Sequence, residues 1–212
     1  DNVEALTAHV AKTLVEQIEH LNHIAGEFSQ FANIGNPKNE VVDLNEVIKQ
    51  VTQLHAIDDR IHIYWNPGSR PVMINADRTH LNRLFTNLIL NAMQATPAER
   101  NVEINIDEEI IGNKVLIKVK DNGNGINEAL QAKIFTPNFT TKTSGTGLGL
   151  AIARGVARAH GGGIDVDSAP GAGATFVLVL PLIAGAGLPA IAAASIAGKP
   201  APATDTSQNR RT

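Results

Sequence analysis

Two glycine-rich runs, about 24 residues apart, carry the residues of this chain that are best suited to chemistry. Residues 121–126 read Asp-Asn-Gly-Asn-Gly-Ile, and residues 144–150 read Ser-Gly-Thr-Gly-Leu-Gly-Leu. Glycine lets a backbone approach a ligand closely and adopt a positive φ, and a glycine-rich turn that opens a helix presents N–H groups to phosphate. The carboxylate of Asp121 can accept a hydrogen bond from an exocyclic amine such as that of adenine. Together the runs predict a nucleotide site, with the base at one end and the phosphates at the other.

Amide side chains on the segment 77–95 would add a metal ligand to this site. Asn87 and Asn91 are four residues apart and share a helix face, and Gln94 follows one turn later. Buried amides need partners, and an amide carbonyl is a hard oxygen ligand that suits Mg²⁺ beside phosphates and waters. Taken alone, such a pattern more often marks a solvated helix face, and a lone Asp more often marks a turn. The ordered set of motifs therefore carries the prediction.

The second glycine run matches neither of two common phosphate-binding motifs. It is not a Walker loop, because no Gly-Lys-Ser/Thr follows, and it is not G-x-G-x-x-G, because position 150 is Leu. The order along the chain is more informative: an amide-bearing helix, an Asp turn, a polar loop, and a glycine loop that enters a helix.

Hydrophobic periodicity and turn residues predict the elements that must position these groups. Helices are expected over 2–34, about 44–56, 77–95, 128–134 and 148–160, and strands over 61–66, 72–75, 102–107, 114–120, 164–167 and 174–180. Asp43 and Asp77 are the expected helix N-caps. The first helix repeats an apolar residue every three or four positions, as a bundle or coiled-coil seam does, so it requires a partner helix.

Composition narrows the choice of function. The 212 residues are 43% apolar, with a net charge of −3 and no cysteine. Nucleic acid is not the default partner without a basic field, and the lack of cysteine excludes disulfides and thiolate chemistry. No apolar run long enough to span a membrane and no signal peptide are visible, and the absence of an initial Met suggests a fragment or a processed product. Residues 183–212, rich in Ala, Gly and Pro, are expected to form a disordered tail.

These motifs resemble the conserved boxes of sensor histidine kinases. Residues 87–92 resemble the N box, 121–125 the first glycine box, 135–139 the F box, 145–150 the second glycine box, and 171–176 the closing strand motif. The resemblance covers about residues 40–182 and implies the Bergerat ATP-binding fold, shared with gyrase, mismatch-repair and chaperone ATPases. The expected fold class is α+β: a two-layer α/β sandwich, with a mixed sheet and helices on one face, preceded by a long helix.

The resemblance also implies a role for each part of the site. Asp121 would bind the adenine amino group, with help from Thr175 through water. Asn91 would hold Mg²⁺ against the phosphates, with Asn87 beside it. Lys142 would neutralise phosphate charge from a mobile lid loop, residues 135–146, although a solvated lysine explains it about as well. The implied ATP-binding residues are Asn87, Asn91, Gln94, Asp121, Gly123, Gly125, Ile126, Thr141, Lys142, Gly145, Thr146, Gly147, Leu148, Gly149 and Thr175.

The residue type at position 87 distinguishes a phosphotransferase from an ATP hydrolase. The ATPase relatives carry a Glu at this position, as the base that activates water, and a neutral amide cannot take that proton. The implied enzyme is thus an ATP-dependent protein-histidine kinase. Two alternatives are kept: a degenerate ATP-binding and dimerisation module without kinase activity, and a gyrase- or chaperone-type ATPase.

The phosphoacceptor of such a kinase is a histidine followed by an acidic residue, and none of the seven histidines here is followed by one. Segment 1–36 is interpreted instead as the second helix of a dimerisation hairpin, so the acceptor would lie outside this chain. The expected partners are a second copy, through helix 2–34, and the receiver domain of a response regulator. Neither nucleic acid nor direct membrane contact is expected. The segment is expected to be cytoplasmic, and a parent protein anchored in a bacterial inner membrane is left open.

Overall fold

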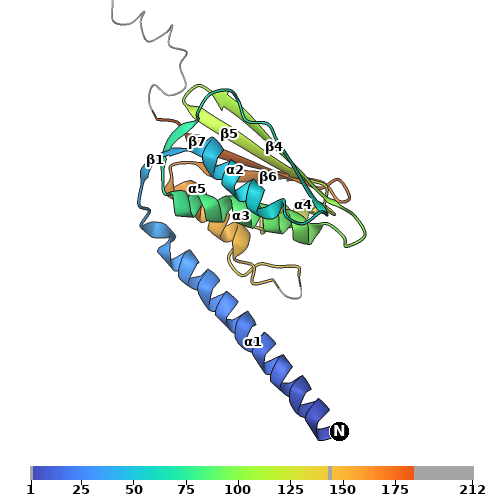
Figure 1. Ribbon diagram of the computed structural model, residues 1–212. Coiled ribbons are helices and arrows are strands. Elements are labelled where there is room, and N and C mark those ends of the chain that lie inside the picture. The colour runs from blue at the N-terminus through green and yellow to red at the C-terminus, as the bar shows by residue number, and fades with distance from the viewer. Residues whose placement is uncertain (1, 143–144, 184–212) are drawn as a thin grey trace, which may run out of the picture.

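The computed structural model describes residues 2–142 and 145–183 (Figure 1). The helices are α1 (Asn2–Ala32), α2 (Leu44–His55), α3 (Arg78–Ala95), α4 (Glu128–Gln131) and α5 (Gly149–Ala159), with a 3-10 turn, η1 (Asn33–Gly35), after α1. The strands are β1 (Glu40–Asp43), β2 (Ile61–Trp65), β3 (Met73–Ala76), β4 (Val102–Ile111), β5 (Lys114–Asp121), β6 (Gly163–Ser168) and β7 (Ala174–Pro181). Every predicted helix and strand is present, with ends that differ by a few residues.

Two aspartates begin the helices predicted after them. Asp43 Oδ1 accepts a hydrogen bond from Asn45 N at 3.1 Å, ahead of α2. Asp77 Oδ1 accepts from Thr79 N and His80 N at 2.9 and 3.1 Å, ahead of α3. These bonds satisfy amides that have no partner inside their helix. Both predicted N-caps are confirmed, and the cap of α3 sets the register of the amide side chains further along that helix.

The main sheet has the strand order β2-β4-β5-β7-β6. Strands β2 and β4 are parallel and the other pairs are antiparallel. Alternation along β5 buries Val115, Ile117, Val119 and Asp121 on one face, and Figure 1 shows α2, α3 and α5 packed on a single side of the sheet. The predicted class is confirmed: a mixed sheet with helices on one face, preceded by a long helix.

Strand β1 was not predicted, and it pairs with β3 in a separate two-stranded sheet. The antiparallel register places Glu40 opposite Ala76 and Asp43 opposite Met73. Four residues give little periodicity, and the partner strand is distant in the sequence, so local pattern could not identify this pair. Asp43 Oδ1 also accepts from Val72 N at 3.1 Å, which joins the start of α2 to the entry of β3.

Helix α1 projects away from the α/β domain, and most of its apolar stripe is exposed (Figure 1). The exposed fractions lie between 47% and 65% for Leu6, Val10, Leu14, Ile18, Leu21 and Phe28. Just after the helix ends, Ile34 is 8% exposed and its Cδ1 lies 3.1 Å from the position of a Cβ built on Gly155 of α5. Lys38 N donates to Asp77 Oδ2 at 2.8 Å, a second link between this segment and the domain.

The chain beyond β7 is described only as far as Ile183, whose N–H donates to Met73 O at 3.1 Å. The rest of the tail predicted over 183–212 lies outside the described residues. Among the described helices, none combines the length and the apolar character that crossing a membrane requires.

Candidate nucleotide-binding site

Asp121 forms one end of the site, at the last position of β5. It is 3% exposed, and its Oδ1 accepts hydrogen bonds from Gly123 N at 2.8 Å and Ala174 N at 3.1 Å. Burial raises the pKa of Asp121, against the opposing effect of these two N–H donors and of the Lys142 ammonium. Because the described residues direct both donors at Oδ1, Oδ2 can accept a hydrogen bond from a ligand.

Glycines allow the backbone turns around Asp121 to pack in direct contact with one another. A Cβ on Gly125 would lie 1.9 Å from Ala169 O, and a Cβ on Gly173 would lie 2.0 Å from Asp121 O. Both glycines have a positive φ, +71° and +77°. A side chain at either position would force two backbone segments apart, so the first glycine box and the turn before β7 form one closely packed unit.

Ser168 joins these two turns through its hydroxyl group. Its Oγ accepts from Ile126 N at 2.9 Å and donates to Gly173 O at 2.6 Å. Gln131 Nε2 donates to Ile126 O and Ser168 O at 3.2 and 2.7 Å. Sequence reasoning missed Ser168, and the only available signal was its place at the end of a predicted strand, just before a Pro-Gly turn.

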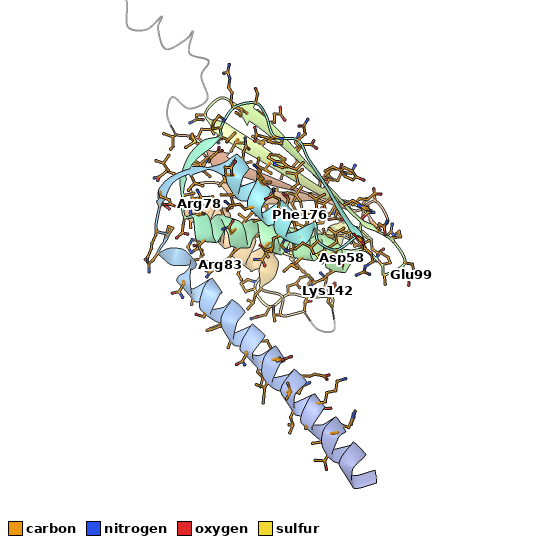
Figure 2. The ribbon with its side chains drawn as sticks, in the orientation of Figure 1. Asp58, Arg78, Arg83, Glu99, Lys142 and Phe176 are labelled. Carbon is orange, nitrogen blue, oxygen red and sulfur yellow. The ribbon has the colours of Figure 1, made fainter. Side chains whose placement is uncertain are left out.

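The C-terminal half of α3 lies against the Asp121 turn. Asn124 N donates to Ala95 O at 2.9 Å, so the Asp121 turn contacts the end of the helix that carries the predicted amides. Asn91 Oδ1 and Gln94 Oε1 both accept hydrogen bonds from Lys142 Nζ, at 3.2 and 2.9 Å. Figure 2 shows Lys142 on the loop beneath α3. The structure therefore brings together a lysine and two amides that are about fifty residues apart in the sequence.

The second glycine box folds back on the F box. A Cβ on Gly145 would lie 2.7 Å from Thr140 Oγ1, and a Cβ on Gly147, whose φ is +70°, would lie 2.6–2.7 Å from the backbone of Asn138 and Phe139. The start of α5 faces α3: a Cβ on Gly149 would lie 3.5 Å from Asn87 Oδ1. Thr146 Oγ1 accepts from Leu148 N at 3.4 Å, and Leu148 is 4% exposed in the core.

Aromatic packing anchors the F box to the domain. Phe135 is 8% exposed and lies edge-on to Phe176 of β7, with ring centroids 6.4 Å apart, and the Arg154 guanidinium lies 5.0 Å from the centre of the Phe135 ring. Phe139 is partly buried against the same core. These contacts attach the two phenylalanines of the F box to the core of the domain.

Two of the predicted residues are not brought to the same place as the others. Thr175 lies between the buried Ala174 and Phe176 on β7, so alternation directs its side chain to the opposite face of the sheet from Asp121. Thr141 is exposed on the lid loop. The contribution of β7 to Asp121 is instead the backbone N–H of Ala174, a donor that side-chain patterns do not indicate.

The remaining geometry fits a nucleotide with Mg²⁺. In the described part of the chain no cluster of three or more His, Cys, Asp or Glu side chains could hold a metal ion. The Asn91 amide oxygen is a hard ligand of the kind that Mg²⁺ accepts beside phosphate oxygens and water. The ammonium group on Asn91 and Gln94 shows that both oxygens face a cation.

Comparison with known proteins identifies the family of this chain. The family model described as Histidine kinase-, DNA gyrase B-, and HSP90-like ATPase matches residues 76–184. The signal transduction histidine-protein kinase AtoS of Escherichia coli (strain K12) is 35% identical over 136 residues, which are 63% of this chain and 22% of AtoS. The sensor histidine kinase ZraS of Klebsiella oxytoca is 37% identical over 141 residues, 65% of this chain and 30% of ZraS. The chain thus spans less than a third of the length of these relatives.

Solved structures show the same resemblance. The catalytic domain of histidine kinase ThkA superimposes with a TM-score of 0.61 and 36% identity, over 68% of this chain and 95% of that one. Full-length ShkA in complex with AMPPNP gives a TM-score of 0.70 and 29% identity, over 82% of this chain and 38% of that one. AtoS and ZraS are both histidine kinases by name. Because the family model matches half of its residues, the chain belongs to the family of histidine kinase-, DNA gyrase B- and HSP90-like ATPases.

Proposed function

We propose that this chain is the ATP-binding catalytic region of a two-component sensor histidine kinase. It would transfer the γ-phosphate of ATP to a histidine on a dimerisation helix that is absent from the chain. The observation that carries the proposal is the pairing of a buried carboxylate, Asp121, at one end of α3 with a cluster of amides, a lysine and glycine turns along the same helix.

Base recognition follows from the geometry of Asp121. Its Oδ1 is held by two backbone N–H groups, so the carboxylate cannot rotate away without breaking both bonds. The other oxygen then presents an acceptor in a fixed place, which suits the amino group of adenine. Guanine carries a carbonyl where adenine has this amine, so a carboxylate here would favour adenine.

Phosphate binding would rest on the lid loop and the start of α5. The turns at Gly145, Gly147 and Gly149 bring backbone N–H groups close to a triphosphate, and Lys142 supplies a positive charge. Mg²⁺, when bound through Asn91, would bridge phosphate oxygens and reduce their negative charge. Asn87 lies beside Gly149 but cannot act as a base toward water, which favours transfer over hydrolysis.

Two protein partners complete the proposed function. The exposed stripe of α1 is suited to a second copy of the chain, because apolar helix faces of this length associate in water. A response regulator is proposed as the receiver of the phosphoryl group. The solved complex of histidine kinase ThkA with response regulator protein TrrA supports this, since ThkA matches 80% of this chain at 29% identity and a TM-score of 0.65.

Calorimetric titration with ATP and Mg²⁺ tests the nucleotide site. The native chain should show saturable binding, and Asp121→Asn should lose it by at least about tenfold, since one unmet hydrogen bond to a buried charge is worth about 1.5–3 kcal/mol. The Asn variant is a close match, because its carbonyl can still accept from Gly123 and Ala174 while its NH₂ group replaces the free acceptor. Absence of binding by the folded native chain would favour the adaptor alternative.

A phosphotransfer assay distinguishes a histidine kinase from an ATPase. The chain, with radiolabelled ATP, should label the histidine of a separately supplied dimerisation hairpin of a kinase relative, with little free phosphate. Rapid phosphate release without labelling would instead support the gyrase- or chaperone-type alternative.

A further inference from the structure

The Lys142 ammonium and the predicted metal ligand are in direct contact. Lys142 Nζ donates to Asn91 Oδ1 at 3.2 Å and to Gln94 Oε1 at 2.9 Å, both within hydrogen-bonding distance. Asn91 is the residue that the proposed function assigns to Mg²⁺. The same amide oxygen thus has two candidate cations, one supplied by the chain and one by the nucleotide complex.

The charge of Asp121 makes this position attractive to a cation even without nucleotide. Lys142 and Asp121 attract each other across the site. Two neutral amide oxygens and a buried carboxylate together form an acceptor-rich region, which attracts a cation or a hydrogen-bond donor. Among the described residues, Lys142 supplies that donor.

The lid loop is folded so that it presents Lys142 to α3. The Lys142 N–H donates to Thr140 Oγ1 at 3.0 Å, and that hydroxyl lies 2.7 Å from where a Cβ on Gly145 would be. Lys142 is thus bonded to Thr140 on one side, and Phe139 packs against the core next to it. These local contacts restrict the backbone before Lys142, so less freedom is lost when its side chain reaches α3.

We propose that Lys142 is the resident cation of the nucleotide-free site: it holds the lid loop against α3 through Asn91 and Gln94 until Mg²⁺ and phosphate replace those contacts. This rests on the proposed function, and it adds a resting state to it. Lys142 would serve twice, first as the cation that satisfies the amides and then as a charge released toward the phosphates. Gln94, which is exposed and next to the metal ligand, would act mainly in the resting state.

Hydrogen exchange of the lid loop, measured without nucleotide at millisecond to second times, tests this proposal. Amides over residues 135–142 should exchange about five- to tenfold faster in Lys142→Met than in the native chain, as expected for losing hydrogen bonds worth about 1 kcal/mol. Lys133→Met is the matched control, because Lys133 is an exposed lysine close by in the sequence, so the change of charge is the same. It should leave lid exchange unchanged.

A double variant shows whether the two side chains act together. Gln94→Met alone should accelerate lid exchange by less than Lys142→Met, and the double variant should be no faster than Lys142→Met alone, because the contact is lost only once. Additive acceleration, or equal exchange in the native chain and in Lys142→Met, would overturn the proposal.

Binding of ATP to the same samples separates this inference from the proposed function. If the native chain binds ATP in an Asp121-dependent manner but lid exchange does not depend on Lys142, the resting-state role fails and the nucleotide site stands. If the folded native chain does not bind ATP, the proposed function itself fails.

Discussion

The two ends of the nucleotide site are built in different ways. At the base end, Asp121 is 3% exposed and held by backbone N–H groups, and the turns around it touch through glycines. At the phosphate end, Lys142 contacts Asn91 and Gln94 through long side chains near the surface. The base end is therefore complete before any ligand arrives, whereas the phosphate end is held by contacts that a ligand can exchange.

This difference has a functional reason. Adenine is uncharged and always presents the same hydrogen-bonding edge, so a rigid pocket recognises it with little ordering cost on binding. The phosphates change in number and charge during the reaction, so the loop that holds them must open and close. Substitutions at the base end should therefore affect the fold, and substitutions at the phosphate end should affect ligand binding.

The largest effect is expected from a methyl group at the base end. Gly125→Ala would place a Cβ 1.9 Å from Ala169 O at a φ of +71°, so the variant should lose at least about 3 kcal/mol of the free energy of unfolding. Gly171→Ala is the control, since Gly171 has a φ of +79° but open space around it. It should lose only the backbone strain, about 1–2 kcal/mol. Urea denaturation measures both, and equal losses would mean that the close approach is unimportant.

The same substitution at the phosphate end should affect binding more than folding. Gly147→Ala would crowd the backbone of Asn138 and Phe139, but the lid loop can move away because it lies at the surface. We expect the free energy of unfolding to fall by no more than the backbone strain of the positive φ, about 1–2 kcal/mol, while ATP affinity falls by about tenfold or more. Adenosine, which lacks phosphates, should bind as it does to the native chain. A loss of adenosine binding would show that the two ends are not independent.

Much of this architecture was predictable, and the exceptions have physical causes. The helix that carries Asn91 and the strand that ends at Asp121 follow from periodicity and capping, which are local properties. Strand β1 did not follow, because its pairing with β3 is not local. The contact between Lys142 and Gln94 depends on the path of a loop without periodicity, and the Ala174 N–H that holds Asp121 is a backbone group that no residue type reveals.

The side chain of Thr175 does not lie where the resemblance predicts it. Its hydroxyl was expected near adenine from the resemblance, yet strand alternation, which was visible over 174–180, directs it to the other face of the sheet. Ala174, the residue on the correct face, has no hydroxyl. What Ala174 supplies to the base end is its backbone N–H, which donates to Asp121 Oδ1 at 3.1 Å.

A smaller effect on chemistry is expected from Asn87, which lies beside Gly149 at the phosphate end. Asn87→Glu would place a carboxylate near Gly149, where it could act as a base toward water, so release of phosphate from ATP should rise several-fold. Asn87→Gln is the matched control, because it adds the same length without a base and should leave release unchanged. The assignment of Asn87 would be contradicted by unchanged release in the Glu variant, provided that this variant still binds ATP.

The smallest effect, and the most specific to the base end, concerns the stability of the free protein. Burial raises the pKa of Asp121, so the folded chain holds that proton more tightly than the unfolded chain. The protonated Asp121 side chain therefore adds to the free energy of unfolding at pH values below the unfolded pKa, near 3.8. This contribution is lost as the pH rises through the pKa of Asp121 in the folded chain. At neutral pH the ionised carboxylate therefore lowers the free energy of unfolding.

Asp121→Asn should remove the destabilising effect of the ionised carboxylate without breaking the hydrogen bonds from Gly123 and Ala174. We expect the variant to be more stable than the native chain at pH 7 in the absence of nucleotide, and the difference to disappear as the pH falls toward 4. Urea denaturation across this range measures it, with exposed Asp107→Asn on the same sheet as control. With saturating ATP the native chain should become more stable than the Asn variant, since a ligand stabilises only the chain that binds it. An Asn variant that is less stable at pH 7 would show that the ionised carboxylate supports the free fold. An Asn variant that is more stable at pH 7 would show that the base end keeps an unfavourable buried charge, which adenine binding requires.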